Sequence, residues 1–420
     1  MKIYVTGLGV VSGIGLGVAE NITSLRNHQH GMEKVTLFPT ALNVPVSEVK
    51  YSNDELKRLL SLDVHKTISR TALLGLLAAK EAITDARLDI TTLRTGLISS
   101  TSVGGMDLSE HFYEAFKEDH SKGRLREVIS HDCGASTEIM ADCLGIKDFV
   151  TTISTACSSA SNAIMLGARM IRHGLLDAVV VGGTDALCKF TLNGFNSLMI
   201  LDAEHCRPSD ASRAGLNLGE GAGYLVLQPE ASLQESLQKP LKEMPDASLN
   251  KLSEASHPRE PYCLLSGAAN VNEAFHQTGS SPEGDGAYWA MQEAIIQSTI
   301  RPEEIDYINV HGTGTPSNDL SEGLAIRRIF GKNAPAFSSV KAFIGHTLGA
   351  SEGIEAVYSV LSIHHGFVYP NLNFKEPIIE TGLIPETSFR EGLPIRHVLS
   401  NSFGFGGNNS SLLFSSLKER

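Results

Sequence analysis

The sequence predicts an α/β fold made of two similar halves, and three observations support this. Short apolar stretches rich in β-branched residues alternate along the chain with longer stretches of helical apolar spacing, the pattern of layered α/β proteins. A polar segment, residues 231–261, divides the 420-residue chain near its middle. Both halves end in a glycine-rich turn followed by a strand, "NLGEGAGYLVLQ" in the first and "NSFGFGGNNSSLLF" in the second.

The first half, residues 1–230, opens on "KIYVTGLGVVS", which we interpret as a buried strand. One lysine followed by apolar residues would also suit a signal peptide, but five glycines interrupt the run over residues 1–19, so we favour the strand. The elements that follow are a helix over 66–86, a strand over 95–105 that enters a glycine turn, a helix over 158–173 stopped by Gly174, and a buried strand over 177–183.

Residues 231–261 are polar and charged with several prolines and no aromatic residue, which predicts a linker or surface loop. The second half, residues 262–420, repeats the plan of the first. "EIDYINVHGTGTP" indicates a strand and a glycine turn, and residues 345–366 indicate an apolar helix that ends His-Gly, as the helix over 158–173 does. We therefore predict an internal duplication, with functional residues where strand ends meet.

Charge and cysteine usage exclude several classes of protein. The net charge of −12 argues against a general nucleic-acid binder, although it leaves room for a local basic patch. The six cysteines contain no CxxC pair, so zinc and redox spacings are absent and a reducing cytoplasm is expected. No apolar run reaches the roughly 18 residues that a membrane-spanning helix needs.

Cys157, in "TTISTACSSAS", lies between a β-branched run and a predicted helix. A thiol at a helix N-terminus is near unsatisfied N–H groups, which we expect to lower its pKa. Small neighbours leave space for a substrate. A small buried thiol without chemical function is the alternative, and Cys157 alone does not decide between them.

His311 and His346 each stand at a strand-to-turn junction beside glycines. Lys341 precedes His346 by five residues, and the carboxylates of Glu322 and Asp319, which follow His311, are available to pair with it. Ordinary structural histidines and a solvated ion pair are the alternatives.

Metal and dinucleotide sites are both disfavoured by the sequence. Cys157, His311 and His346 have no local ligand spacing, so no metal is expected. The start "GLGVVS" has Ser12 where a dinucleotide fingerprint needs its third glycine.

Four ordered motifs, "TACSSA", "HGTGTP", Lys341 to His346, and "NSFGFGG", together resemble the β-ketoacyl-acyl-carrier-protein synthases. These are the elongating, KAS I/II-like condensing enzymes of fatty acid and polyketide synthesis. The likeness extends to "VTGLGVVS" at the start and to "CRPSDASRAGLNLGEGAGYLVL" in the middle, and so covers nearly the whole chain. It implies a thiolase-like fold, a five-layer αβαβα arrangement of two similar halves, usually assembled as a homodimer.

The resemblance also implies roles for individual residues. Cys157 matches the acylated nucleophile, carried by the first half, and His311 and His346 match the catalytic histidines of the second. Lys341 matches the supporting lysine, with Glu322 as its partner, and Thr313 and Thr315 match the contacts of the phosphopantetheine arm. Phe405 matches the gate residue, whose N–H forms the oxyanion hole together with that of Cys157. Phe195 matches an acyl-pocket residue.

The implied reaction is acyl transfer to Cys157 followed by decarboxylative condensation with malonyl-acyl carrier protein. Decarboxylation supplies the carbanion, so no second cysteine is needed as a base, and none is found near Cys263 or in "NSFGFGG". No cofactor or metal is expected beyond the substrates' own phosphopantetheine. The acidic carrier protein would dock on a basic patch, for which Lys66, Arg70, Arg207 and Arg213 are candidates.

Two other functions compete with this hypothesis. One is a non-catalytic partner subunit like the chain-length factors, which lack the nucleophile. The other is a cysteine hydrolase using Cys157, His311 and Asn401. "ACSSA" and "HGTGTPSND" are closer to the polyketide and aryl-polyene branch, and Asn408 stands where the family commonly has threonine.

Overall fold

The computed structural model describes residues 1–233 and 260–418 of the chain. The predicted linker over 231–261 therefore lies almost entirely outside the described residues, and its conformation stays a prediction.

A long mixed sheet forms the frame of the molecule, in the strand order β12-β11-β13-β14-β10-β1-β9-β7-β5-β6. The first half contributes β1 (Ile3–Ser12), β5 (Thr95–Ser100), β6 (Phe149–Ile153), β7 (Ala178–Asp185) and β9 (Gly221–Pro229). The second contributes β10 (Cys263–Asn272), β11 (Tyr307–Asn309), β12 (Ala336–Ser338), β13 (His397–Gly404) and β14 (Asn408–Ser415). The halves join where β1 pairs with β10, with Val5 opposite Cys263.

The two halves have the same topology on either side of this junction. Outward from it, the first half runs β1, β9, β7, β5, β6, and the second runs β10, β14, β13, β11, β12. In each half the first two pairings are antiparallel and the last two are parallel. The internal duplication that the glycine-rich turns predict is therefore present in the strand order.

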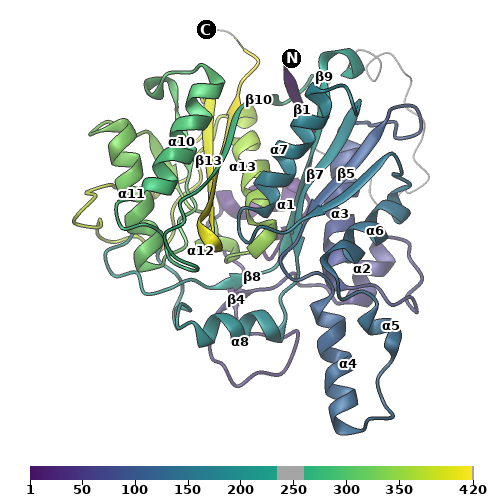
Figure 1. Ribbon diagram of the computed structural model, residues 1–420. Coiled ribbons are helices and arrows are strands. Elements are labelled where there is room, and N and C mark those ends of the chain that lie inside the picture. The colour runs from purple at the N-terminus through teal and green to yellow at the C-terminus, as the bar shows by residue number, and fades with distance from the viewer. Residues whose placement is uncertain (234–259, 419–420) are drawn as a thin grey trace.

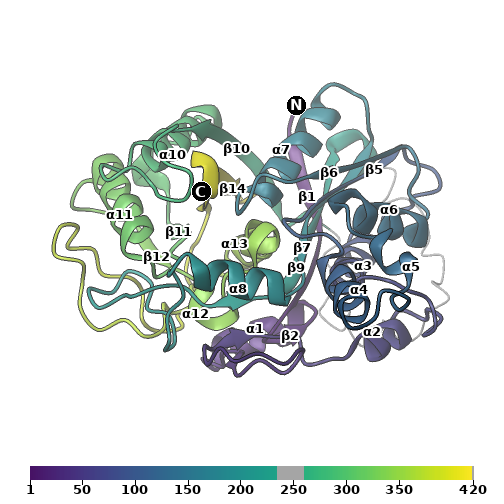
Figure 2. The same cartoon turned by 60° about the horizontal axis from the view of Figure 1, so that its bottom comes forward.

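Helices cover the sheet in layers, which Figures 1 and 2 show from two directions. α7 (Ser159–Arg172) and α13 (Ser351–His365) pack against each other and against strands of the sheet, between the halves. α3 (Arg70–Asp85) and α6 (Cys133–Leu144) cover the outer face of the first half, and α10 (Asp285–Ser298) and α11 (Pro316–Phe330) that of the second. The order is helix, sheet, helix, sheet, helix, as expected.

Shorter elements complete the fold. These are the helices α1 (Val18–Arg26), α2 (Asn53–Leu59), α4 (Met106–Glu118), α5 (Leu125–Val128), α8 (Lys189–Ser197) and α12 (Lys341–Ile344), the 3-10 turns Pro302–Glu304, Leu348–Ala350 and Phe405–Gly407, and the two-residue strands β2 (Gly15–Leu16), β3 (Met32–Glu33), β4 (Val46–Ser47) and β8 (Leu218–Gly219).

The largest apolar core surrounds the two central helices, where side chains such as Ile164, Val181, Leu225 and Ile354 are buried. α13 approaches β9 very closely: a Cβ added at Gly223 would lie 2.3 Å from the backbone carbon of Gly353. Because sheets or helices surround α13 as far as Ile363, its polar residues in that part are buried as well as its apolar ones.

Most predicted elements are confirmed, with shorter bounds. The opening segment is β1, and the helix expected over 66–86 begins only at Arg70, where Ser69 caps it by accepting a hydrogen bond from the N–H of Ala72. Among the described residues, no helix is long and apolar enough to cross a membrane.

One proposed docking residue is wrongly assigned. Arg70 is 3% exposed and forms a buried ion pair with Glu220, at 2.6 Å, so it cannot meet a partner. Arg207 is half-buried and bound to Asp202 and Glu204, whereas Lys66 is exposed. The sequence does not show that Arg70 will pair with a carboxylate 150 residues away and be buried with it.

Candidate active site

Cys157 lies in the tight turn between β6 and α7, next to the first turn of the helix. The turn places the preceding residue, Ala156, at a positive φ of 54°. Ser402 of β13 donates to the carbonyl of Cys157, and a Cβ at Gly404 would lie 3.2 Å from the N of Cys157. The end of β13 thus closes over the thiol, which is only 5% exposed.

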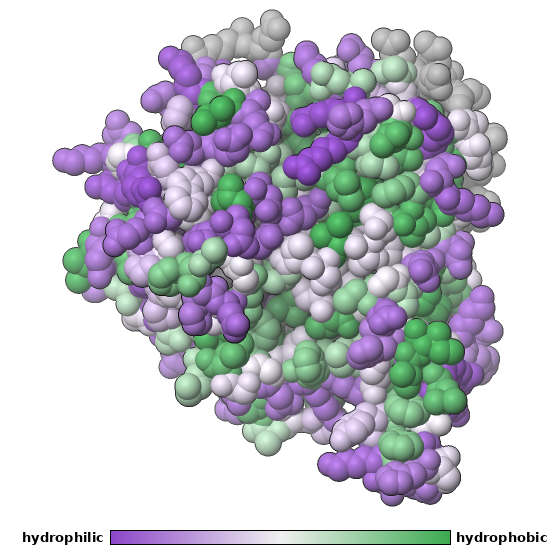
Figure 3. Space-filling view, viewed as in Figure 1, coloured by the Kyte–Doolittle hydropathy of each residue, from purple (hydrophilic) through white to green (hydrophobic). Residues whose placement is uncertain are grey.

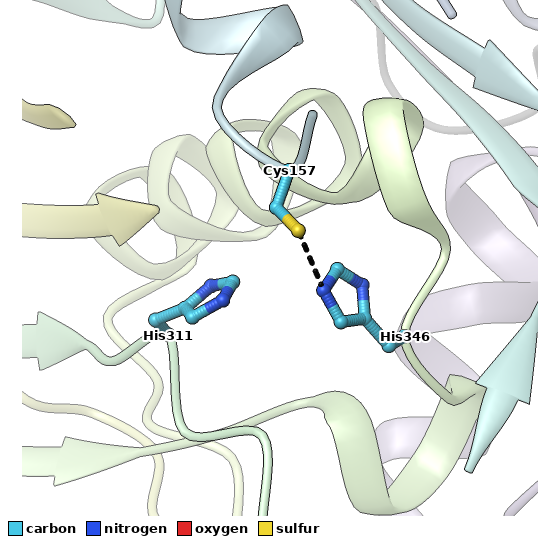
Figure 4. A group of neighbouring side chains, drawn as sticks. All are labelled: Cys157, His311 and His346. Atoms are coloured by element: carbon cyan, nitrogen blue, oxygen red, sulfur yellow. Dashed lines mark hydrogen bonds between the residues drawn. The ribbon is translucent and has the colours of Figure 1, made fainter. Parts of the chain in front are cut away.

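His346 stands ahead of α13 as Cys157 stands ahead of α7, so the duplication brings the two together. Its Nε2 lies 3.1 Å from Sγ of Cys157 (Figure 4). Its Nδ1 accepts a hydrogen bond from the N–H of Leu348. Since Nδ1 is an acceptor, the ring proton of the neutral imidazole is on Nε2, facing the thiol.

His311 follows β11 and faces the same centre, with its ring 5.4 Å from that of His346 (Figure 4). Nζ of Lys341 lies 3.3 Å from its Nδ1. An ammonium can only donate, so His311 also carries its proton on Nε2. Burial and the charge of Lys341 lower the pKa of both histidines well below the usual value, which keeps both rings neutral.

The sequence analysis assigns Glu322 as the partner of Lys341, and this assignment is wrong. The partner is Glu355 of α13. Nζ of Lys341 lies 2.5 Å from Oε1 of Glu355, and both side chains are 1% exposed. Glu355 is a carboxylate within the apolar stretch of a helix expected to be buried, which is the signal that sequence reasoning overlooked.

The two carboxylates near His311 instead hold its loop. Glu322 accepts hydrogen bonds from the backbone N–H groups of His311 and Gly312, both at 2.9 Å. Asp319 accepts from the N–H groups of Ser209 and Gly314. Neither carboxylate is left to pair with Lys341.

The pKa of Cys157 moves opposite to the sequence-based expectation. Burial raises it to about 11, and the charge of Lys341 and the N–H groups of Phe405 and Cys157 only partly oppose this. The helix N-terminus alone suggests a low value, but loss of water outweighs it because the gate and β13 cover the thiol. Near neutral pH Cys157 is therefore a thiol and not a thiolate.

Phe405, the expected gate residue, reaches Sγ of Cys157 through its backbone N–H. The backbone N–H groups of Phe405 and Cys157 both act on the sulfur, as a hole for a developing oxyanion requires. The ring of Phe405 stacks on Phe195, with centroids 5.9 Å apart. The two residues assigned to the gate and the acyl pocket are therefore in contact.

Asn408, where the family commonly has threonine, joins the gate to the nucleophile loop. Its Oδ1 accepts hydrogen bonds from Ser158 at 2.6 Å, from Asn162 at 3.1 Å and from Asn270 at 2.6 Å. The sequence marks this position as a departure, but only the structure shows what it holds.

Thr313 and Thr315 stand together in the turn before α11, with their hydroxyl oxygens 2.9 Å apart. Asn401, which the hydrolase hypothesis places beside His311, instead donates to Glu322 and accepts from Ser411. It does not orient the imidazole, so the Cys-His-Asn triad is not assembled.

The fold does bring the three metal-ligand types together, although their sequence spacing predicts no such site. One ligand atom each from Cys157, His311 and His346 lies within 4.8 Å of the others. Zinc binds such donors, but it needs a bare imidazole nitrogen. Leu348 and Lys341 occupy both Nδ1 atoms, so each Nε2 carries a proton and the trio is unsuited to a metal.

Comparison with known proteins agrees with this geometry. Residues 1–232 match the N-terminal domain of β-ketoacyl synthases and residues 262–375 match their C-terminal domain. The chain is 31% identical to 3-oxoacyl-[acyl-carrier-protein] synthase 2 of Staphylococcus aureus over 99% of its length and 98% of that protein. It is also 31% identical to the synthase of the same name from Synechocystis, over 98% of this chain and 97% of that protein.

Solved structures with the same fold include ketosynthases that work with a partner. The ishigamide ketosynthase/chain length factor superposes with a TM-score of 0.87 at 28% identity, covering 99% of both chains. A chain of the complex between the ketosynthase ApeO and its chain length factor ApeC, from Xenorhabdus doucetiae, gives a TM-score of 0.80 at 29% identity, covering 99% of this chain and 98% of that one. The chain has the thiolase fold, belongs to the β-ketoacyl synthase family, and is an acyltransferase of the condensing type.

Proposed function

We propose that Cys157 accepts the acyl group and that His311 and His346 stabilise the enolate of the malonyl extender. The observation that carries this is the shared tautomer: both neutral rings turn an Nε2–H toward the thiol. Two such donors suit an oxygen that becomes negative, and neither ring is a base.

The reaction then has two stages. In the first, the Cys157 thiolate attacks the thioester carbonyl of an acyl carrier, and the pantetheine thiolate leaves and takes up the proton that the cysteine lost. The Nε2–H of His346, 3.1 Å from Sγ, stabilises the thiolate without accepting its proton. A thiol with a pKa of about 11 needs this support to react near neutral pH.

In the second stage, the malonyl thioester loses carbon dioxide. The electron pair of the broken carbon–carbon bond stays on the α carbon and forms the enolate with the thioester carbonyl. The enolate oxygen receives the two Nε2–H donors, and its carbon attacks the acyl carbonyl on Cys157. The oxyanion of that step is held by the N–H groups of Cys157 and Phe405. Collapse expels the Cys157 thiolate and leaves a β-ketoacyl thioester on the carrier.

The substrates and partners follow from this chemistry. We assign delivery to the phosphopantetheine arm of an acyl carrier protein, which Thr313 and Thr315 would contact, and no cofactor or metal of the enzyme's own. The ring of Phe195 would line the acyl chain behind Phe405. The reducing cytoplasm is the compartment that its free cysteines suit.

We also propose that the enzyme works as a homodimer or as a heterodimer with a related synthase. β6 ends the sheet, and all five of its residues are half-buried. Such an edge offers unpaired backbone groups to another chain. The ishigamide and ApeO proteins, each described together with a chain length factor, support a heterodimer.

One experiment tests the function. The protein is incubated with acyl carriers of several chain lengths and its mass is measured. We expect an acyl adduct that Cys157→Ala abolishes, and a β-ketoacyl product once malonyl carrier is added. An adduct that persists in Cys157→Ala contradicts the assignment, and release of free acid without a carbon–carbon bond indicates a hydrolase.

A further inference from the structure

Glu352 of α13 is a buried carboxyl that the mechanism has not used. Its side chain is 0% exposed. Neither of its oxygens has a conventional hydrogen-bond partner within the described residues. An ionised carboxylate without hydrogen bonds is very unfavourable inside a protein, so Glu352 must carry a proton or have a partner.

The unsatisfied atoms around Glu352 form one group. Oε2 of Glu355 and Oγ of Ser400 also have no conventional partner in the described part of the chain. Glu352 and Glu355 are three residues apart on one helix face, and their side chains are within hydrogen-bonding reach of each other. Ser400 of β13 faces Glu352 from the other side.

Charge shows where the missing proton is. Lys341 is the cation beside the pair, and it already occupies Oε1 of Glu355. Two ionised carboxylates would leave one buried negative charge without a counterion. Burial and the neighbouring Glu355 accordingly raise the pKa of Glu352 well above its usual value.

A single proton on Glu352 satisfies every one of these atoms. The protonated oxygen of Glu352 donates to Oε2 of Glu355, and the hydroxyl of Ser400 donates to the other oxygen of Glu352. Glu355 then keeps its negative charge and its contact with Lys341, whose Nζ lies 3.3 Å from Nδ1 of His311.

We propose that Glu352 is a protonated carboxylic acid that donates to Glu355 and thereby acts as a positioning residue for Lys341 and His311. It touches no reacting atom. It acts through a series of contacts, from Glu352 to Glu355, from Glu355 to Lys341 and from Lys341 to His311. These contacts keep the Nε2–H of His311 directed at the enolate. The inference rests on the proposed role of His311, but the proton itself can be observed without any turnover.

Infrared difference spectroscopy tests the proton directly. The spectrum of the wild-type enzyme minus that of Glu352→Gln at neutral pH should contain one carboxylic-acid C=O band that shifts in deuterium oxide. Absence of such a band overturns the proposal even if the enzyme condenses acyl chains normally. A band in an enzyme that leaves no adduct on Cys157 would instead contradict the proposed function alone.

Kinetics test the positioning role. Glu352→Gln keeps a donor to Glu355 and should condense within about twofold of the wild type, whereas Glu352→Leu removes the donor and should lower condensation about tenfold. Acylation of Cys157 should be unchanged in both. Equal losses in both variants, or an equal loss of acylation, would contradict it. Ser362→Ala, at another buried position of α13, is the matched control.

The pH profile supplies a second kinetic readout. The charged groups that face Glu352 are Glu355 on its own helix and Lys341 on α12, and β13 adds the hydroxyl of Ser400. As pH rises through its elevated pKa, Glu352 ionises and loses its donor. Wild-type condensation should therefore decline at alkaline pH through a step that Glu352→Gln lacks, and an identical decline in both would refute this role.

Discussion

The substitution His311→Ala should separate the two stages of the reaction. Sγ of Cys157 is hydrogen-bonded to His346 and not to His311, whose Nδ1 is engaged by Lys341. In the proposed mechanism, His311 therefore contributes to the enolate but not to the thiolate. The variant should acylate Cys157 at close to the wild-type rate while its condensation fails.

The magnitude follows from the loss of one preorganised donor. Removing one such N–H from an oxyanion site costs about 2.7–4 kcal/mol, or roughly 10²–10³ in rate. His311 is 1% exposed, so water does not readily replace the missing donor. Lys341 keeps its ion pair with Glu355, which limits damage to the fold.

Two assays are needed, because only their ratio tests the reasoning. Intact-protein mass spectrometry follows acylation of Cys157, and release of carbon dioxide from malonyl carrier follows the second stage. His364→Ala, at an exposed histidine of α13, is the control and should leave both rates unchanged. If His311→Ala loses acylation as severely as carbon dioxide release, the division of roles between the two histidines is wrong.

Three further outcomes are expected. Alkylation of Cys157 by a neutral reagent should accelerate about tenfold per pH unit up to about pH 11, because burial raises the pKa of its thiol, and a plateau near neutral pH would disprove the buried thiol. Arg70→Met should lower the free energy of unfolding by about 3–5 kcal/mol in denaturant titrations, because Glu220 loses its buried cation. If the variant instead binds the carrier protein more weakly and unfolds as the wild type does, Arg70 belongs to the docking surface after all. Asn408→Ala should remove the one acceptor that three donors share and slow acylation, and a normal acylation rate in mass spectrometry would show that the Phe405 turn needs no such anchor.

The sequence was most informative where a local pattern decides the structure. Apolar periodicity located β1, α7 and α13, and the repeated glycine-rich turns indicated the duplication that the strand order confirms. Cys157 was singled out because it stands at the predicted start of a helix among small residues, and His346 because glycines flank the turn that carries it. The structure places both at one centre.

Long-range pairing was not predictable in the same way. Glu322, Asp319 and Glu355 are all reasonable partners for Lys341 by composition, and only packing selects Glu355. The prediction of a low pKa for Cys157 was wrong for a related reason. A helix N-terminus is visible in the sequence, whereas the strand and gate that exclude water from the thiol come from residues more than 240 positions later.

The duplication explains both the place of the site and its need for a buried acid. The two halves bring the starts of α7 and α13 together, and these deliver Cys157 and His346 to one point. Ser351–Ile363 of α13 are all buried, and most of α7 is buried as well, so polar groups on these helices need partners inside the protein. On α7 a hydroxyl is enough, as Ser161 bonds Ser410. On α13 the cation that orients His311 requires an anion, and Glu355 supplies it. Glu352 then adds a second carboxyl beside the first, which the enclosed layer can hold only as the neutral acid.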